Sequence, residues 1–470
     1  MKHFDVRWRG LRSFDDTGWV HIRPLTILLG PNSSGKSSFL LPFLLLKQTL
    51  EARDEDVALN SRGSLTNAGS YKDIVFQHED DRTISFGFRF RSGMEEPDSD
   101  SPVGTSPPVN GAMVFAEGSY PGDIDLVRYL LKDEFGRILL QRRRRRKAGS
   151  YSMNRFLDVA AGVTDQEVQP DKPQTQESMS FIRADHPVHF MFTGRNVIGR
   201  WLDRTAEQRS ELEGDEVSGS MSPTLTAYIS VCGFFAGRLE NLLNRISYVG
   251  PIRARFKRVY EVSGEAPASV GVEGEFTPEV IFQQQSPQLL DDINEWMKRF
   301  GFEGQLRTEA KGSDAFQILT GSGDRATNIA DVGFGASQVL PLVVQALTGP
   351  ENGMIIAEQP EIHLNPRLQT VLADLFAWAV GQNKGVLVET HSEHLLLRVR
   401  RLIAEGTLKP DDVTLLYVEH DQGVSTTREV PIAPNGHISP SEWPVGFFED
   451  ALSESLALAS AQSDHNMGTG

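Results

Sequence analysis

The sequence predicts an α/β fold, and three features carry that prediction. The apolar run Leu25 to Leu29 leads into a glycine-rich loop and then into a helix around Phe39. Met354 to Ala357 is an uninterrupted apolar run closed by an acidic residue, and "GVLVETHSEHLLLRV" gives a further strand followed by a helix. Continuous apolar runs of this length are typical of strands buried on both faces by helices.

Composition limits the class of protein. At 470 residues the chain is too long for one compact core, which predicts two or three domains. The net charge of −16 argues against a surface that coats nucleic acid all over. A single cysteine, Cys232, excludes an internal disulfide framework. No stretch has 18 uninterrupted apolar residues and the N-terminus lacks the apolar core of a signal peptide, so we expect a cytoplasmic protein without a membrane segment.

The loop after Leu29 reads GPNSSGKSS, with the spacing Gly-x4-Gly-Lys-Ser. Between a strand and a helix this pattern predicts a phosphate cradle, because glycines let successive backbone N–H groups converge on an anion at a helix N-terminus. Lys36 is expected to reach the β- and γ-phosphates, and the Ser37 hydroxyl to hold Mg²⁺. The expected nucleotide-binding residues are Gly30, Pro31, Asn32, Ser33, Ser34, Gly35, Lys36, Ser37 and Ser38.

Strands with alternating polarity are predicted at 4–8 and 83–90, on either side of the loop and its helix. Pro42 is expected to kink this helix or to limit its first turn. Residues 95–111 are acidic and rich in Pro, Ser and Gly, which predicts a linker.

The region from 112 to 245 is mixed, with a predicted hairpin turning at 134–136, and apolar patterning resumes near Ile246. The division that follows is an N-terminal part with the phosphate loop, a middle region, a C-terminal part and a tail, at 1–90, 91–245, 246–435 and 436–470.

Three later segments supply what a phosphate cradle requires elsewhere. Glu358 closes its apolar run and provides an acidic group to orient magnesium. "DVGFGASQVLPLVVQAL" places glycines before an apolar helical run, and Thr390-His391 stand between a strand and a helix. Taken singly, each has a structural alternative: a core strand, a plain helix N-terminus and a structural histidine.

In this order and spacing the motifs resemble those of ABC-type ATPases of the SMC, RecF and OLD group, and of the bacterial "AAA family ATPase" proteins. The resemblance covers about 1–90 and 246–450. It implies a P-loop ATPase head with an inserted, partly irregular middle region, binding ATP and Mg²⁺. It further implies that His391 contacts the γ-phosphate. It also implies a signature segment that closes over the nucleotide bound by a second copy; its residues are Gly333, Gly335, Ser337 and Gln338.

The resemblance also implies a magnesium-sensing glutamine, for which Gln77 is the candidate, with a surface strand residue as the alternative. The expected metal ligands are therefore Ser37, Glu358 and Gln77. The chain departs from the family where Gln359 replaces the usual catalytic glutamate, because an amide cannot take a proton. Hydrolysis is then expected to be slow, to rely on Glu361, or to need a partner; the expected catalytic set is Glu358, Gln359, Glu361 and His391.

Two basic clusters stand out in an acidic chain. The run of Arg142, Arg143, Arg144, Arg145, Arg146 and Lys147 is a candidate surface for nucleic acid or an acidic partner, with a solvated strand end as the alternative. In the second cluster, alternation would place Arg253 and Arg255 on one strand face, to pair with carboxylates or with phosphate.

The resemblance implies a head that forms an ATP-dependent homodimer or higher oligomer and controls a separate effector, possible partners including a nuclease, in prokaryotic anti-phage defence. No nuclease activity is expected in this chain, because no spaced acidic cluster follows His391. The alternatives are a RecF-like DNA-repair ATPase and, less favoured, a transporter's ATPase subunit. Transporter heads place the loop and the signature far closer than the roughly 300 residues that separate them here.

Overall fold

The structure is a computed structural model. It describes residues 3–91, 110–120, 122–145, 150–156, 173–211, 221–262, 264, 267–284, 286–321, 323, 326–333, 335–439 and 441–443. Most of the linker predicted at 95–111 and most of the predicted tail at 436–470 lie outside these residues.

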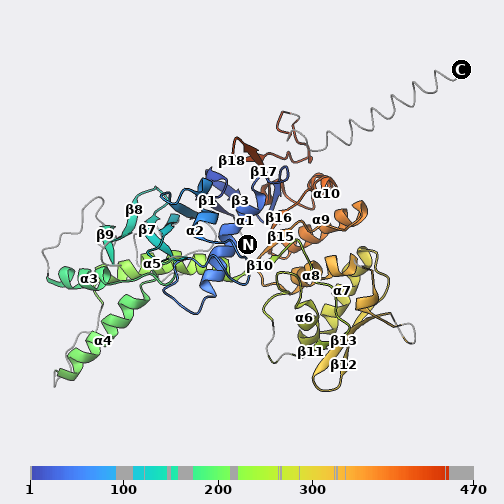
Figure 1. Ribbon diagram of the computed structural model, residues 1–470, viewed down its shortest axis with the longest axis horizontal. Helices are drawn as coiled ribbons and strands as arrows, with labels where there is room; N and C mark the ends of the chain where they lie inside the picture. The colour runs from blue at the N-terminus through green and yellow to red at the C-terminus, as the bar shows by residue number, and fades with distance from the viewer. Residues whose placement is uncertain are drawn as a thin grey trace.

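A six-stranded sheet forms the centre of the molecule (Figure 1). Its strands follow the order β10-β15-β16-β4-β17-β18, with bounds Ile246–Val249, Met354–Glu358, Gly385–Glu389, Leu25–Leu29, Val413–Asp421 and Val424–Val430. All neighbours are parallel except β17 and β18, which form an antiparallel hairpin. The predicted α/β class is confirmed, since the three apolar runs lie side by side as β15, β16 and β4.

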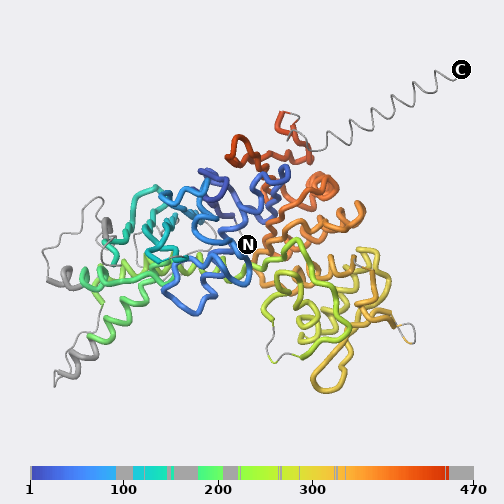
Figure 2. Tube along the Cα trace, in the orientation of Figure 1, coloured from blue at the N-terminus to red at the C-terminus, as the bar shows by residue number. Residues whose placement is uncertain are grey.

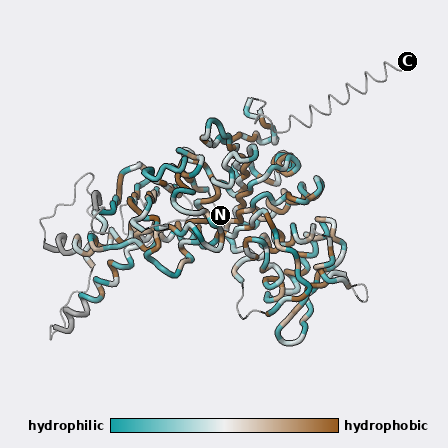
Figure 3. The backbone as a smooth tube through the Cα atoms, in the orientation of Figure 1, coloured by the Kyte–Doolittle hydropathy of each residue, from teal (hydrophilic) through white to brown (hydrophobic). Residues whose placement is uncertain are grey.

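Alternate side chains of this sheet enter two separate cores. Leu28, Ile356 and Leu387 belong to the first core, on the side of helix α1 (Lys36–Leu50). Ile27, Ala357 and Val388 belong to the second core, which three helices cover: α8 (Gly335–Thr348), α9 (Pro366–Gly381) and α10 (Glu393–Ala404). Both faces of the strands are therefore apolar, as the uninterrupted runs predicted. The hydropathy colouring in Figure 3 shows brown along these interior segments.

Helix α1 runs as one element from Lys36 to Leu50 and carries Pro42 inside it, so the helix continues past the proline. Most of its residues are buried. On one side the Trp8 indole donates a hydrogen bond to the carbonyl of Phe39 at 3.0 Å. This packing fixes the helix whose first residues follow the phosphate loop.

A second, antiparallel sheet lies on the other side of α1. Its path is β2-β1-β5-β6-β7-β8-β9 with β3 paired to β1; the bounds are Phe14–Asp16, Phe4–Leu11, Ile84–Phe90, Asn110–Glu117, Ile124–Lys132, Ile138–Arg144, Tyr151–Phe156 and Val20–Ile22. The hairpin predicted at 134–136 joins β7 to β8. Because β5 pairs with β6, the sheet continues across the predicted division at residue 90.

The middle region also contains three helices: α3 (Pro173–Arg183), α4 (Arg195–Glu211) and α5 (Pro223–Asn244). Helix α5 contacts α1, and its Tyr228, Phe235 and Leu239 are buried in the first core. Figure 2 shows the N-terminal segments, in blue, between the middle region and the C-terminal helices.

A smaller unit lies between β10 and α8. It holds α6 (Thr277–Gln284), α7 (Pro287–Arg299) and the strands β11, β12, β13 and β14, at Tyr260–Glu261, Leu306–Lys311, Ala315–Thr320 and Thr327–Asn328. The segment with Arg253 and Arg255 is not a strand, so the predicted shared strand face is wrong. A loop forms there because β10 ends at Val249 and the chain turns away from the sheet.

In the part of the chain that the structure describes, no helix is both long and apolar enough to cross a membrane.

Candidate active site

The loop from Gly30 to Gly35 joins β4 to α1 and needs glycine at both ends. Gly30 has φ of 148°, and a Cβ there would lie 2.3 Å from the carbonyl oxygen of Val418 on β17. Gly35 has φ of 105°, and a Cβ would lie 2.7 Å from the Ser425 hydroxyl of β18. Both positions combine a left-handed backbone with crowding. The β17–β18 hairpin therefore forms a wall against which the loop is fitted.

Ser425 ties this hairpin to the loop. Its hydroxyl lies 2.6 Å from the carbonyl oxygen of Ser34 and 2.7 Å from the hydroxyl of Ser13, in the β1–β2 turn. The Ser34 hydroxyl is buried and has no hydrogen-bond partner in the described part of the chain. An unpaired buried hydroxyl in this loop fits a site for an anion, because a bound phosphate supplies acceptor oxygens.

Lys36 is the first residue of α1 and is almost fully buried. Its Nζ donates to the carbonyl oxygens of Pro31 at 2.7 Å and Gly30 at 3.1 Å. Burial lowers the pKa of this amine, while the negative charges of Glu389 and Glu361 oppose that shift. The ammonium is thus held at the loop by neutral carbonyls, which a phosphate can replace.

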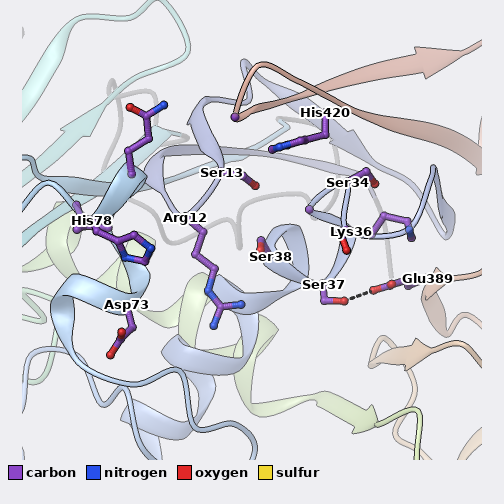
Figure 4. A pocket seen from close by; sticks show the side chains of 15 residues that line it. Arg12, Ser13, Ser34, Lys36, Ser37, Ser38, Asp73, His78, Glu389 and His420 are labelled. Carbon is purple, nitrogen blue, oxygen red and sulfur yellow. Dashed lines mark hydrogen bonds between the residues drawn. The ribbon is translucent and has the colours of Figure 1, made fainter.

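The Ser37 hydroxyl donates a hydrogen bond to Glu389 Oε2 at 2.8 Å (Figure 4). Glu389 ends β16, which lies between β15 and β4 in the sheet. Sequence reasoning chose His391 in this segment and missed Glu389. The available signal was an acidic residue at the end of a buried apolar run, the same signal that identified Glu358.

Glu358 ends the neighbouring strand and is the register partner of Glu389. The Tyr248 hydroxyl donates to Glu358 Oε1 at 3.0 Å. Burial, and next the charge of Glu389, raise the pKa of Glu358 to about 7. Burial also raises the pKa of Glu389, although the Ser37 hydrogen bond and the Lys36 charge favour its ionised form. The two carboxylates therefore lie together in a poorly solvated site.

Arg253 forms hydrogen bonds with the backbone of the turn after β15. Its guanidinium donates to the carbonyl oxygens of Glu358 at 3.2 Å and Gln359 at 3.4 Å, and burial lowers its pKa to about 10. Gln359 has φ of 43°, and its N–H donates to the Glu389 carbonyl at 2.7 Å. The backbone at Gln359 is thus strained and held between two strands.

Glu361 lies next to His391. Its Oε1 accepts from the backbone N–H of His391 at 2.6 Å, whereas its Oε2 is buried without a hydrogen-bond partner among the described residues. Burial raises the pKa of Glu361. Burial, and next the charge of Lys36, lower the pKa of His391, which favours a neutral imidazole. The structure thus brings three expected residues together: Lys36, Glu361 and His391.

A cavity of about 530 Å³ opens in front of the loop. Figure 4 shows Ser37 and Glu389 at one end of the cavity and Asp73 and His78 at the other. The lining residues come from the loop, the β1–β2 turn, the 73–78 segment and the hairpin: Arg12, Ser13, Ser33, Ser34, Gly35, Lys36, Ser37, Ser38, Asp73, Val75, Gln77, His78, Glu389, His420 and Gly423. Arg12, Asp73, His78 and His420 had no sequence signal, since long-range folding alone brings them here.

Gln77 lines this cavity, but a Cβ built on Gly423 would lie 3.8 Å from its side-chain nitrogen, which places the amide at the tip of the β17–β18 hairpin. No hydrogen bond joins Gln77 to Ser37, Glu358 or Glu389 in the described ranges.

The predicted signature residues divide into two pairs. Gly333 and Gly335 lie at the start of α8 and are exposed or half-buried. Ser337 and Gln338 are buried in the same protomer, and the Gln338 amide lies 3.3 Å from the Ser337 hydroxyl. As placed here, Ser337 and Gln338 cannot contact a second copy, because α8 turns them toward the second core.

The arginine run is not one surface. Arg142 is fully buried, donates to the carbonyl oxygens of Ile182 at 2.9 Å and Asp185 at 2.8 Å, and lies over the Phe192 ring. Its predicted role in binding nucleic acid is wrong, because strand alternation turns its side chain inward. Arg144 pairs with Asp125. Arg143 and Arg145 are exposed, and Arg146 and Lys147 lie outside the described residues.

Two family models match the chain. Residues 277–396 match the family described as AAA ATPase domain, a span that includes Glu358 and His391. Residues 408–458 match a family described as protein of unknown function (DUF3696). The match of residues 277–396 to an ATPase family agrees with the predicted ATPase, a class that in general binds ATP and Mg²⁺. A search of curated proteins found no match.

Among solved structures, the chain is similar to the SMC head domain from Thermotoga maritima, at 12% identity over 92% of this chain and 100% of that chain, with a TM-score of 0.36. It is similar to the Smc head domain with an extended coiled coil bound to the C-terminal domain of ScpA, derived from Pyrococcus furiosus, at 13% identity, 92% and 96% coverage and a TM-score of 0.39. A third structure is the SmcHead bound to the C-winged helix domain of ScpA, at 12% identity, 92% and 98% coverage and a TM-score of 0.37.

Proposed function

We propose that the chain binds Mg²⁺-ATP at the loop of residues 30–38 and hydrolyses it with Glu361 in the role that Gln359 cannot fill. The observation that supports this most directly is that Lys36 and Ser37 line the cavity, while the charge of Lys36 interacts with both Glu361 and His391, which are joined by the hydrogen bond from the His391 N–H. The loop amides, the unpaired Ser34 hydroxyl and Lys36 hold the phosphates. Magnesium would be held at the Ser37 hydroxyl and the neighbouring carboxylates, where it would neutralise charge that develops on the phosphates.

Glu361 suits a water-activating role for two reasons. Its free Oε2 has no competing hydrogen bond in the described part of the chain, and its other oxygen is fixed by the His391 N–H. Burial raises its pKa, which makes the carboxylate a stronger proton acceptor. His391, favoured as neutral imidazole, can donate one N–H to a γ-phosphate oxygen.

The matched pair Glu361→Gln and Gln359→Ala tests this assignment. Removing a general base lowers kcat by roughly 10²–10⁴-fold, so Glu361→Gln should hydrolyse ATP at least 100 times more slowly while its ATP affinity, measured by calorimetry, stays close to wild type. Gln359→Ala should retain most of the rate. Wild-type turnover by Glu361→Gln would refute the assignment.

We further propose that ATP joins two copies through Gly333 and Gly335 and that this closure controls a partner effector. Support for the closure is the exposed glycine turn at the start of α8. Size measurements with and without ATP should show nucleotide-dependent association in the wild type, and Gly335→Asp should block it. A dimer that ignores both ATP and this substitution would point to another mode of assembly.

An anti-phage role rests on the family resemblance of the motifs. The test is protection of a bacterial host against phage when the chain is expressed with its neighbouring genes, compared with the Lys36→Ala chain. Equal protection by both chains would show that ATP binding is not needed for defence. If neither chain protects the host, the proposed anti-phage role is wrong.

A further inference from the structure

A second carboxylate lies closer to the phosphate loop than the predicted one. Ser37 Oγ donates to Glu389 Oε2 at 2.8 Å, and Glu389 is 3% exposed. Strand β16 lies between β15 and β4, so Glu389 stands between Glu358 and the loop. Ser37 is the residue whose hydroxyl is expected to ligate the nucleotide's metal ion, and the side chain aimed at that hydroxyl is Glu389 (Figure 4).

Three buried or half-buried carboxylates gather at this point: Glu358, Glu361 and Glu389. Glu358 and Glu389 are register partners on adjacent parallel strands, which lie about 4.8 Å apart. Glu361 adds a buried oxygen without a hydrogen-bond partner among the described residues, and its charge acts on both Glu389 and Lys36. Lys36 also acts on Glu389, but its Nζ is bonded to the Gly30 and Pro31 carbonyls. Arg12 acts on Glu358 and Arg253 acts on Glu361, but among the described residues the side-chain hydrogen bond to Glu389 comes from the Ser37 hydroxyl.

The donor set suits magnesium bound together with a nucleotide. Among the described residues, no group of three or more His, Cys, Asp or Glu could hold a metal ion by itself. Magnesium is commonly held by one or two carboxylates, water and substrate phosphates, without an all-protein cage. A hydroxyl and a carboxylate at one end of a phosphate-binding cavity match that pattern.

We propose that Glu389 binds the magnesium ion of the nucleotide, through its carboxylate or through one metal-bound water, beside the Ser37 hydroxyl. Glu358 then adds negative charge near the metal ion from the adjacent strand, and the Tyr248 hydroxyl donates a hydrogen bond to one of its oxygens. This inference rests on the proposed ATP binding and assigns its metal to a residue outside the predicted set.

The test measures metal binding without turnover. ATP affinity is determined by calorimetry with excess chelator and again with Mg²⁺, and Mn²⁺ binding in the presence of ATP is followed by electron paramagnetic resonance. Glu389→Gln keeps the size of the side chain and can still accept from Ser37. The matched control is Glu303→Gln, an exposed glutamate between α7 and β12.

In Glu389→Gln, metal-free ATP affinity should remain near wild type, whereas the gain given by Mg²⁺ and the Mn²⁺ affinity should fall by about tenfold or more. The thermal midpoint of the nucleotide-free variant should equal or exceed that of wild type, because one of two neighbouring buried charges is gone. Glu303→Gln should behave as wild type.

A Glu389→Gln chain with the full magnesium gain overturns the inference while ATP binding stands. Loss of metal-free ATP affinity together with a lower thermal midpoint also overturns it, since Glu389 would then only support the loop. A wild-type chain that binds no ATP under either condition overturns the proposed function, and this inference with it.

Discussion

The coupled carboxylates Glu358 and Glu389 give a prediction about stability whose size follows from the structure. Burial and the neighbouring charge raise the pKa of Glu358 from 4.5 to about 7. Between these two values the folded chain holds a proton that the unfolded chain has released. Stability from this group is therefore fully present below pH 4.5 and is lost as pH rises toward 7. Each pH unit corresponds to about 1.4 kcal/mol, so the loss is about 3 kcal/mol.

Glu358→Gln removes this term while keeping an oxygen that can accept from Tyr248. We expect the variant to be more stable than wild type at pH 8 by about 3 kcal/mol, with the difference shrinking to near zero by pH 4.5. For a chain of 470 residues, with an unfolding entropy of about 2.1 cal/mol/K per residue, the shift in thermal midpoint is roughly 3 °C. Thermal unfolding of the nucleotide-free proteins, followed by circular dichroism from pH 5 to 8, measures it.

Magnesium supplies the control in the same experiment. Mg²⁺ with ATP should stabilise the wild type more than Glu358→Gln. The difference in thermal midpoint between the two proteins should therefore shrink or change sign. If Glu358→Gln is no more stable than wild type at pH 8, or if the difference does not change with pH, Glu358 is not a buried carboxylate repelled by Glu389.

Three further substitutions have expected outcomes. Arg142→Ala leaves buried carbonyls without their donor and should lower stability by about 2–4 kcal/mol in urea unfolding, whereas Arg143→Ala should change it little; equal effects would contradict the burial of Arg142. Gly35→Ala should weaken ATP binding by at least tenfold in calorimetry, because a Cβ meets the Ser425 hydroxyl at 2.7 Å, and unchanged affinity would mean that the loop adapts. Arg253→Lys should lower kcat more than it changes the affinity for ATP, because one ammonium cannot reproduce the forked hydrogen bonds of the guanidinium to the carbonyls of Glu358 and Gln359. Wild-type kinetics in this variant would show that Arg253 does not position the turn for catalysis.

Features encoded in short stretches were predictable from the sequence. The runs that became β4, β15 and β16 are apolar at most positions because both faces of this sheet are covered, and that pattern can be read without knowing which segments pack against it. The loop and the start of α8 were identified in the same way, from glycine spacing before an apolar helix. Each of these signals lies within one segment of the chain.

What failed depended on which segments become neighbours. Six consecutive basic residues look alike in composition, but β8 pairs with β7 and β9 and turns Arg142 inward under α3. Ser337 and Gln338 were assigned to a surface because they follow the glycines, yet the helix rotates them into the core. The role of Gln77 stays a prediction: it lines the same cavity as Ser37 and Glu389, and its amide lies near the hairpin tip.

Glu389 is a further residue whose importance depends on which strands become neighbours, and it lies in the candidate active site. An acid at the end of a buried strand marks the correct edge of the sheet, and both Glu358 and Glu389 satisfy that rule. Which of them meets Ser37 depends on strand order, because the strand inserted next to β4 brings its terminal residue to the loop. The structure inserts β16 there, so the acid beside the loop hydroxyl comes from the strand that also leads to His391. Glu389 and His391 thus lie two residues apart on one segment, and that segment also contacts Glu361 through the His391 N–H.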